Sequence, residues 1–572
     1  MKHRPHALLL LVPAALLLAS CSSTPPASTP PVLGASRAAA LRTCEGLLAG
    51  FRHQQAQVDA VTAVAEGALK QGAQPMPAHC LVRGSMHKRK GSDGRDYAIG
   101  FEMRLPQAWN GRFYYQGNGG LDGNVQPALG TLGGGPLTGA LFQGFAVISS
   151  DAGHTGAQTP YFGLEPQARL DYGYQAVAKL TPMAKDLIRT AYGKGPDRSY
   201  IGGCSNGGRH AMVAAARLGE QYDGYLIGAP GYRLPNAALA QLWGAQQFSA
   251  LATPGATAPH PLAPQGRIPD LSNAFTAQER QTVAQAILTR CDALDGARDG
   301  MVQDVQACQA RFNLQTDVPS CGAERNGQCL STAQKQVIGT LFSGARSGSG
   351  QPLYAPFPYD SGLVGANWGT WKFVNSLALD PLAVATVFSV PPGRVDALKE
   401  DLGARLALFN ATDENYKESG LSLMTPPGHE QPGNLAPLRA RGAKMLLYHG
   451  VSDAVFSAED TRLWIEALGK ALGGPADDFA RYFPVPGMNH CSGGPATDQF
   501  DLLGPLVQWV EQGVTPQGVP ATARGAGNAG GVNTELPQDW SAARGRPLCA
   551  YPAVARYKGE GSLEEAGSFV CQ

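Results

Sequence analysis

Residues 199–208 read SYIGGCSNGG, a short apolar stretch that runs directly into closely spaced glycines. Within it, Gly203-Cys204-Ser205-Asn206-Gly207 matches the G-x-S-x-G pattern of a sharp strand-to-helix turn that exposes a serine hydroxyl above a sheet. Because the chain contains 72 glycines, chance matches are common, and a glycine-rich turn without chemistry is the alternative. The strand before the serine and the helix-compatible segment 209–218 after it favour a nucleophile turn, the name used below for residues 203–207.

Segments on both sides of this turn alternate between strand and helix patterns. Short apolar runs predict strands, and stretches with helical spacing separate them. The predicted strands are 97–105, 111–115, 145–149, 199–201, 444–448 and 481–485, and the predicted helices are 172–192, 209–218 and 500–511. This alternation is typical of a mostly parallel sheet covered by helices, so we expect the α/β class.

Between residues 232 and 432 the alternation gives way to loops rich in proline and glycine, cysteine pairs and clustered aromatic residues. We interpret 232–432 as an inserted lid domain. Residues 41–231 and 433–572 are then expected to form one core domain that carries the chemistry. A chain of 572 residues with 43% hydrophobic residues can bury a core of that size.

The N-terminus has the features of a secretion signal. Basic residues precede an apolar run at 7–18, which is too short to span a membrane. The segment Leu18-Ala19-Ser20-Cys21 resembles a bacterial lipobox, whose cysteine is lipidated. We predict a lipoprotein-type signal peptide at 1–21 with Cys21 as lipid site, and a flexible tether at 22–40. Ordinary cleavage near the same place is the alternative. The predicted location is the outer membrane, as a lipoprotein, or the periplasm or extracellular space.

The charge composition argues against polymeric charged partners. The net charge is +1, and 16% of the residues are charged, so the chain has no strong overall field of either sign. Nucleic acid is therefore disfavoured as a partner. A membrane is expected as a partner only through the N-terminal lipid anchor.

A serine hydroxyl is a weak nucleophile at neutral pH, so it needs a base and an acceptor that orients the base. In the fold that the turn indicates, the chain order is serine, acid, histidine. Asp453 follows the predicted strand 444–448, and His490 follows the strand 481–485. We predict Ser205 as nucleophile, His490 as base and Asp453 as the acid. Structural roles are expected for the competing residues His154, His210, His449, Asp460, Asp477 and Asp478.

Acyl transfer to a serine also needs two backbone N–H donors directed at the developing oxyanion. Asn206, the residue after the nucleophile, is expected to supply one of them. The loop Gln116-Gly117-Asn118-Gly119-Gly120 follows a predicted strand and is rich in glycine. We expect the second donor from Gly120, with Gly119 as second choice, and a plain turn is the alternative.

Eleven cysteines are present, and ten remain when Cys21 is assigned to lipidation. An even number in an exported protein predicts disulfides. Proximity in the sequence suggests the pairs Cys44–Cys80, Cys291–Cys308, Cys321–Cys329 and Cys549–Cys571. Cys204 and Cys491 are left over, and each adjoins a predicted catalytic residue. If Ser205 and His490 meet, these cysteines approach the separation of roughly 4.4 to 6.8 Å between α-carbons that a disulfide requires. Two unrelated buried thiols are the alternative.

Residues 291–301 read CDALDGARDGM, a short loop with three aspartates and two glycines. Hard divalent cations favour such oxygen clusters, and calcium tolerates irregular loop geometry. The spacing differs from that of an EF-hand, which ends in a glutamate. A calcium loop and a solvated acidic turn are both consistent with this spacing. An ion at this place in the predicted lid would be structural.

Four motifs together resemble those of the tannase and feruloyl esterase family. They are the nucleophile turn, the loop at 291–296, the acid segment 448–453 and the histidine segment 486–494, which reads PGMNHCSGG. The similarity extends from about Cys44 to Cys571. The resemblance implies an α/β-hydrolase core with a large lid, a disulfide between Cys204 and Cys491, and bound calcium. The calcium ligands that it implies are the carboxylates of Asp292, Asp295 and Asp299 and the carbonyls of Ala297 and Met301.

The resemblance also implies that the substrates are esters of small aromatic acids, held between lid and core. Within the family, the acid loop 452–457 is similar to that of bacterial enzymes that hydrolyse a terephthalate monoester, where Phe456 would pack on the substrate ring. Trp368 and Trp371 are further candidates for lining the cleft, and a role in the lid core is their alternative. Those enzymes bind the free carboxylate of the substrate through a lid arginine, but no Arg or Lys lies between Lys372 and Arg394 here.

These features predict a secreted serine esterase that acts on feruloyl, galloyl or terephthaloyl esters through an acyl-serine intermediate. The first alternative is a hydrolase selective for mono(2-hydroxyethyl) terephthalate, and the lack of a matching lid arginine argues against that selectivity. The second is a surface-tethered binding lipoprotein without catalysis. The presence of nucleophile, base, acid and oxyanion glycines disfavours it.

Overall fold

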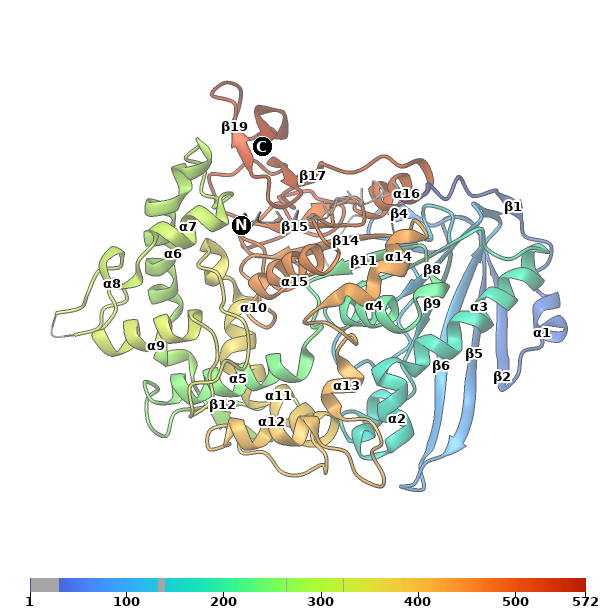
Figure 1. Ribbon diagram of the computed structural model, residues 1–572, viewed down its shortest axis with the longest axis horizontal. Coiled ribbons are helices and arrows are strands. Elements are labelled where there is room, and N and C mark those ends of the chain that lie inside the picture. The colour runs from blue at the N-terminus through green and yellow to red at the C-terminus, as the bar shows by residue number, and fades with distance from the viewer. Residues whose placement is uncertain (2–29, 132–138, 264, 323) are drawn as a thin grey trace.

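The central element of the molecule is a mixed sheet of nine strands (Figure 1). The strands follow the order β15-β14-β11-β10-β8-β9-β6-β5-β2. The protein is described by a computed structural model that covers the chain except residues 2–29, 132–138, 264 and 323. Apart from Met1, the predicted signal peptide with its lipid site Cys21 and the first part of the predicted tether therefore lie outside the described residues.

Six neighbouring strands of this sheet run parallel, so their carboxyl ends meet at one edge. They are β8 (Arg112–Gln116), β9 (Ala146–Ser150), β10 (Arg198–Cys204), β11 (Gly224–Gly228), β14 (Lys444–Gly450) and β15 (Ala480–Val485). Five of them overlap predicted strands, and β11 is the one that the sequence pattern missed.

Three long antiparallel strands complete the sheet at the other side. β6 (Asp96–Pro106) pairs with β9 and with β5 (His79–Lys90), and β5 pairs with the edge strand β2 (Ala56–Val64). Only β6 was predicted. β2 is partly exposed along its whole length and mixes polar with small residues, so its sequence lacks the continuous apolar run of the buried strands.

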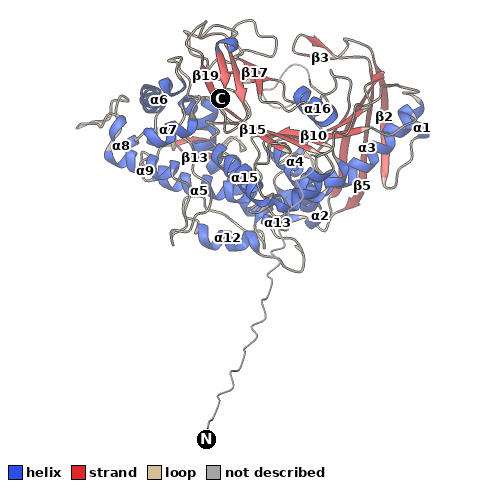
Figure 2. Cartoon of the chain, turned by 45° about the horizontal axis from the view of Figure 1, so that its top comes forward, coloured by secondary structure: helices blue, strands red, loops and turns tan. Residues whose placement is uncertain are grey.

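Alternate side chains of the parallel strands enter two separate cores, because successive residues of a strand point to opposite faces. Ile201 and Ile227 pack with α3 (Ala176–Tyr192) and α4 (Asn206–Arg217). Tyr200 and Leu226, their chain neighbours, pack on the other face with α16 (Leu503–Gln512). Figure 2 shows α16 on one side of the sheet and α3, α4 and α15 (Ala458–Ala471) on the other.

Residues 229–443, between β11 and β14, add no strand to the central sheet and are called the helical insertion below. They form the green to orange part of Figure 1, from α5 to α14. Capping boxes begin two of its helices, with Thr276 and Glu279 at α6 and Ser331 and Gln334 at α9. Its elements are α5 (Leu234–Ser249), β12 (Thr257–Pro259), β13 (Arg267–Pro269), α6 (Ala277–Cys291), α7 (Val305–Arg311), α8 (Leu314–Asp317), α9 (Thr332–Phe342), α10 (Ala366–Gly369), α11 (Leu379–Ala383), α12 (Leu402–Asn410), α13 (Gly420–Met424) and α14 (Ala436–Ala440).

Small elements surround the core at both ends of the chain. The C-terminal part forms a three-stranded antiparallel sheet and a two-stranded one, which the sequence pattern did not indicate. These strands are β16 (Gln499–Phe500), β17 (Gly518–Thr522), β18 (Gly545–Cys549), β19 (Ala555–Tyr557) and β20 (Phe569–Cys571). The remaining short elements are β1 (Ala39–Ala40), α1 (Gly46–Gly50), β3 (Lys70–Gln71), β4 (Gln74–Pro75), β7 (Ala108–Trp109) and α2 (Pro166–Leu170).

The second half of the predicted tether, residues 33–40, contacts the core. The Leu33 N–H donates to the Val510 carbonyl at 3.2 Å, and the Ser36 N–H donates to the Glu511 carboxylate at 3.0 Å. Glu511 also accepts two hydrogen bonds of 2.7 Å from Arg112 on β8. A buried carboxylate thus joins this segment to the sheet and to α16.

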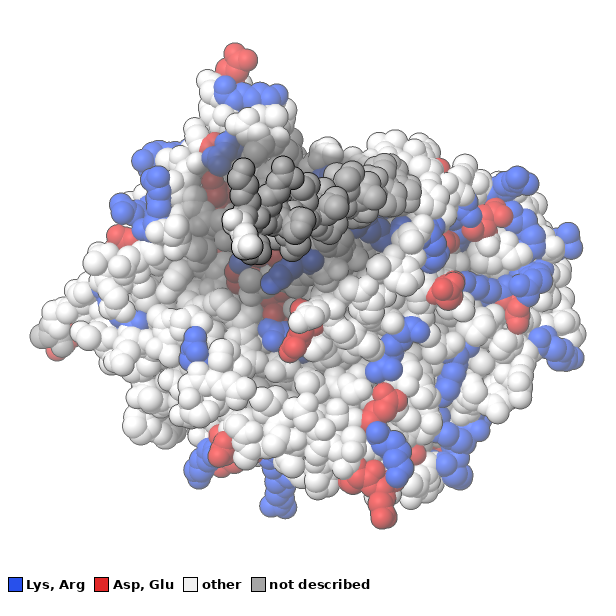
Figure 3. All heavy atoms as spheres, viewed as in Figure 1, with Lys and Arg blue, Asp and Glu red and all other residues white. Residues whose placement is uncertain are grey.

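Five disulfides join Cys44–Cys80, Cys204–Cys491, Cys291–Cys308, Cys321–Cys329 and Cys549–Cys571, the pairs named from the sequence. Within the described chain, none of the helices has both the length and the apolarity that a bilayer crossing needs. On the face shown in Figure 3, basic and acidic side chains are interspersed.

Candidate active site

Ser205 occupies a strained turn between the end of β10 and the first residue of α4. Its backbone has φ 65° and ψ −126°, a conformation that a serine adopts only where its surroundings enforce it. The flanking glycines are required by close backbone contacts. A Cβ atom at Gly203 would lie 2.4 Å from the Gly117 carbonyl oxygen, and one at Gly207 would lie 2.3 Å from the same atom. The nucleophile turn is therefore packed directly against the loop that follows β8.

His490 is held by a buried aspartate. Its Nδ1 lies 2.6 Å from Asp453 Oδ2, and the second carboxylate oxygen accepts the N–H groups of Val455 at 2.9 Å and Phe456 at 3.0 Å. Burial alone would raise the pKa of Asp453, but the charge on His490 and hydrogen bonds from His449 and His490 outweigh it and hold that pKa below its usual range. An ionised acceptor keeps the proton of a neutral His490 on Nδ1 and leaves Nε2 free to act as base.

Sequence reasoning missed the second histidine on this carboxylate. His449 is fully buried, with Nε2 3.2 Å from Asp453 Oδ2 and Nδ1 2.8 Å from the Thr461 hydroxyl. It was expected to be structural, and its contacts make it a support of the acid. Its position directly before the acid loop, four residues from Asp453, was the available signal.

Ser205 and His490 line one pocket, together with Gly117, Gly119, Gly120, Trp371 and the cysteines Cys204 and Cys491. Among the described residues, no direct hydrogen bond joins the Ser205 hydroxyl to His490, whose Nε2 lies 3.8 Å from Cys491 Sγ. Catalytic hydrogen bonds are often long without substrate and shorten when it binds. The disulfide from Cys204 to Cys491 spans 287 residues and keeps the two α-carbons 6.1 Å apart.

The predicted oxyanion donors lie around Ser205. Asn206 is the first residue of α4, and N–H groups in the first turn of a helix have no partner within the helix. A Cβ atom built on Gly119 would lie 4.0 Å from the Ser205 Cβ, whereas the Gly120 carbonyl accepts a hydrogen bond of 3.2 Å from the Tyr172 hydroxyl. Both glycines line the pocket, and the choice between their N–H groups stays a prediction.

Two of the three predicted aromatic residues contact His490 edge-on. The ring centroids of Trp371 and Phe456 lie 5.5 and 5.3 Å from that of His490, at interplanar angles of 83° and 75°. Trp371 comes from the helical insertion and Phe456 from the acid loop. Of the two rings, Trp371 also lines the Ser205 pocket, so an aromatic acyl group on Ser205 would meet the Trp371 ring there.

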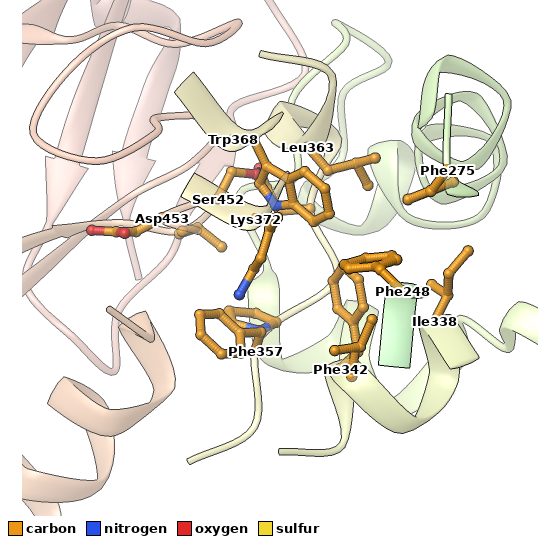
Figure 4. Close-up of a pocket in the computed structure, with 14 residues that line it drawn as sticks. Phe248, Phe275, Ile338, Phe342, Phe357, Leu363, Trp368, Lys372, Ser452 and Asp453 are labelled. Atoms are coloured by element: carbon orange, nitrogen blue, oxygen red, sulfur yellow. The ribbon is translucent and has the colours of Figure 1, made fainter. Parts of the chain in front are cut away.

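Trp368 lies elsewhere, and its predicted contact with substrate is not supported by its position. It packs against Phe275 and Phe373 inside the helical insertion. There it lines a second cavity, which reaches Asp453 but does not include Ser205 (Figure 4). Lys372 projects into this cavity, with its Nζ 3.9 Å from the centroid of the Phe357 ring. Burial lowers the pKa of Lys372 to about 7.

The acidic loop lies away from the Ser205 pocket, at the end of α6. Two of its carboxylates have partners: Asp292 accepts from the Asp299 N–H at 3.1 Å within the loop, and Asp299 pairs with the buried Arg546 on β18. Asp295 Oδ2 is buried without a hydrogen-bond partner among the described residues. Burial, with the charges of Asp299 and Asp292 adding to it, raises the pKa of Asp295 to about 7.

No group of three His, Cys, Asp or Glu side chains in the described ranges is arranged to hold a metal ion by itself. The orphaned oxygen of Asp295 and the mutual repulsion of the three aspartates nonetheless fit a cation. Backbone carbonyls would have to supply the remaining ligands, as the family resemblance implies for Ala297 and Met301.

The competing candidates have other partners. His210 pairs with Asp122, and His154 stacks on Phe162 at 3.6 Å between ring centroids. Asp460 pairs with Arg233. Asp478 pairs with Arg439 at 2.9 Å.

Comparisons with known proteins agree with this architecture. Residues 80–572 match the tannase and feruloyl esterase family. The chain is 38% identical over 540 residues to the mono(2-hydroxyethyl) terephthalate hydrolase of Piscinibacter sakaiensis, covering 87% of this chain and 85% of that protein. It is 27% identical over 499 residues to the probable feruloyl esterase B-2 of Neosartorya fischeri, with 83% of each covered. The crystal structure of feruloyl esterase B from Aspergillus oryzae has a TM-score of 0.71 at 25% identity, covering 92% of this chain and 99% of that one.

A serine turn after a central parallel strand, with acid and histidine on loops after the last two strands, defines the α/β-hydrolases. The predicted fold class is confirmed by the solved structure of the same fold. More narrowly, the chain belongs to the tannase and feruloyl esterase family and is a carboxylic ester hydrolase.

Removing the disulfide beside the serine should lower turnover as well as stability. We expect the Cys204→Ser/Cys491→Ser variant to lose about 5 to 6 kcal/mol of stability on the loop-entropy estimate for a loop of 287 residues. Its kcat on an aryl ester should fall about tenfold or more, because the histidine segment 486–494 can then move away from Ser205. The Cys549→Ser/Cys571→Ser variant, which opens a disulfide outside the pocket, is the matched control and should lose stability while keeping its kcat. Equal kcat values for both variants and the wild type, measured well below their unfolding temperatures, would contradict this role.

Proposed function

We propose that this chain hydrolyses esters of small aromatic carboxylic acids through an acyl-Ser205 intermediate. The observation that carries the proposal is the 2.6 Å hydrogen bond from His490 Nδ1 to Asp453, on a histidine that shares its pocket with Ser205. This bond orients the imidazole so that Nε2 can take the proton of the serine hydroxyl.

In the proposed reaction, Ser205 Oγ attacks the ester carbonyl while His490 takes the hydroxyl proton. The N–H groups of Asn206 and of Gly120 or Gly119 stabilise the oxyanion. His490 then gives the proton to the leaving alcohol, which departs and leaves the acyl-serine. A water molecule, deprotonated by His490, attacks the acyl carbon. His490 then returns the proton to Ser205 Oγ as the bond from the acyl carbon to Oγ breaks, which releases the acid and the free serine.

The aromatic nature of the acid is supported by Trp371 and Phe456, whose rings lie beside His490. It is also supported by the names of the relatives, which are a terephthalate monoester hydrolase and a feruloyl esterase. The 38% identity to the former favours a second candidate, selectivity for mono(2-hydroxyethyl) terephthalate. Against it, the segment between Lys372 and Arg394 contains no basic residue that could bind a free carboxylate.

Replacing the nucleophile tests the proposed chemistry. Ser205→Ala should reduce kcat/KM by about 10⁴-fold or more on methyl ferulate, methyl gallate and mono(2-hydroxyethyl) terephthalate alike, because only residual binding and oxyanion effects remain. Ser349→Ala, a change at an exposed serine of the helical insertion, should leave all three values unchanged. Turnover retained by Ser205→Ala rejects the proposal.

The same assay separates the two candidate substrate ranges. Without a carboxylate-binding arginine, the wild type should hydrolyse the terephthalate monoester and its neutral bis(2-hydroxyethyl) counterpart with kcat/KM values within about tenfold of each other. A much larger preference for the monoester would establish the selective hydrolase instead.

We further propose that Asp292, Asp295 and Asp299, with the carbonyls of Ala297 and Met301, bind a structural calcium ion. The proposal is supported by the buried, unpartnered oxygen of Asp295 and by the clustering of the three carboxylates. The ion would neutralise the loop that α6 and the Cys291–Cys308 disulfide enclose.

Calcium removal should lower thermal stability in a way that depends on Asp295. Because a ligand at 100 times its Kd stabilises a protein by about 2.7 kcal/mol, EGTA should lower the unfolding midpoint by several degrees, and added calcium should restore it. Asp295→Asn should abolish this difference between EGTA and calcium. An unchanged midpoint of the wild type in EGTA, with no calcium detected in the purified protein, would show that the Arg546 pair alone neutralises the loop.

We also propose that the protein is exported and anchored by a lipid on Cys21. Five disulfides support an oxidising compartment. Expressed with its own N-terminus, the wild type should fractionate with membranes, and Cys21→Ser should appear in the soluble fraction. A soluble wild type, or a Cys21→Ser variant that still fractionates with membranes, would argue against the anchor.

A further inference from the structure

A buried cluster outside the Ser205–His490–Asp453 set joins the two elements that carry the predicted oxyanion donors. Asp122 lies two residues after Gly120, lines the Ser205 pocket, and its side chain is only 2% exposed. Its Oδ2 accepts the Asn206 amide at 2.7 Å and lies 3.0 Å from His210 Nε2. One carboxylate oxygen thus links residues 116–122, called the glycine loop below, to the first turn of α4.

Further hydrogen bonds hold both sides of this link. The Asn206 amide lies 3.3 Å from the Asn118 carbonyl, and the Asp122 N–H donates to the Gly119 carbonyl at 3.3 Å. The Asn206 side-chain oxygen accepts Arg209 Nε at 2.7 Å. The Asn206 side chain thus joins the loop to the helix through its amide nitrogen, while its oxygen is held by Arg209 on the same helix.

Arg209 brings a positive charge close enough to interact electrostatically with the Asp122 carboxylate, without a direct ion pair between them in the described part of the chain. It is fully buried, donates to the carbonyls of Gly173 at 2.8 Å and Tyr172 at 3.0 Å, and stacks on the Tyr172 ring. The Tyr172 hydroxyl in turn donates to the Gly120 carbonyl at 3.2 Å. Through Tyr172, Arg209 is therefore connected to Gly120 of the glycine loop as well as to Asn206.

The backbone of Asp122 also departs from ordinary geometry. Its φ is 55°, in the left-handed region that a non-glycine residue rarely adopts. The side-chain bonds to Asn206 and His210 are available to hold it there. Strained positions that are held by their surroundings concentrate at functional sites.

We infer that Asp122 is a positioning residue for the oxyanion hole, and that His210 supports Asp122 and does not act as a base. The inference rests on the proposed acyl-transfer function. Oxyanion donors stabilise the transition state only when they are fixed before the reaction, and loss of one donor costs roughly 10² to 10³ in kcat. A carboxylate that sets the spacing of two such donors without touching the ester should therefore affect kcat and leave KM largely unchanged.

The test is a double-variant cycle on an aryl ester. Asp122→Ala and Asn206→Ala each leave the backbone N–H groups in place but remove the link, so each should lower kcat about 10- to 100-fold with KM within about threefold. The double variant should be no worse than the poorer single one, because both changes remove the same contact. Asp122→Asn keeps an acceptor oxygen and should recover most of the activity.

Asp223→Ala is the matched control. Asp223 also bridges two segments, accepting the Ser199 N–H at 2.9 Å and Arg441 at 3.1 Å, but it does so at the opposite ends of β10 and β11. Its loss should lower the unfolding temperature and leave kcat and KM unchanged. A merely structural role of Asp122 would give the same pattern, and a direct contact of Asp122 with substrate would raise KM; either result overturns the inference.

The rate at which a fluorophosphonate labels Ser205 is measured in parallel. Phosphonylation uses the same N–H donors, so it should slow in Asp122→Ala by a factor similar to that of kcat. If the wild type is labelled but hydrolyses none of the esters, the proposed function fails while the network is still tested by the labelling rate. Equal labelling rates in the wild type and Asp122→Ala would refute the positioning role.

Discussion

The covalent bond between Cys204 and Cys491 is the constraint on which the arrangement of the site depends. Both cysteines adjoin catalytic candidates, so the distance between the nucleophile turn and the histidine loop can change only as far as the bond allows. The parallel strands β10, β14 and β15 bring their carboxyl ends to one edge of the sheet, and the disulfide joins the loops that leave it. Close backbone contact between Gly117 and the nucleophile turn brings the glycine loop to the same edge of the sheet.

Two buried carboxylates with different surroundings support the site, Asp453 behind His490 and Asp122 in the Ser205 pocket. Asp453 orients His490 and is itself surrounded by donors from His449, Val455 and Phe456. Asp122 sits on the other side, between the glycine loop and α4. Both are buried, and buried charges persist only where hydrogen bonds and opposite charges compensate them. These two buried carboxylates therefore orient His490 on one side of the site and the predicted oxyanion donors on the other.

Much of this could be predicted from the sequence, because the motifs are local. The nucleophile turn needs glycines at fixed spacing, and the parallel strands are continuous apolar runs, so both leave clear signals. β2 and β5 face solvent in part and lack such a run, and Leu33 to Ala40 looked like a tether because its anchors, Val510 and Glu511, lie far along the chain. Asp122 could not be singled out, since its role depends on contacts with Asn206 and His210 that only the fold creates.

The helical insertion supplies Trp371 to the pocket, while its neighbour Trp368 faces the separate cavity that holds Lys372. From the helical insertion an acyl group on Ser205 would therefore meet Trp371, while the other residues that line the pocket belong to the core. The most direct test is to quench the enzyme during turnover of a slowly deacylated aromatic ester and to locate the acyl group by peptide mass spectrometry. The account predicts that the acyl group is attached to Ser205. Acylation of another residue, or turnover with no covalent intermediate on the peptide that contains Ser205, would contradict it.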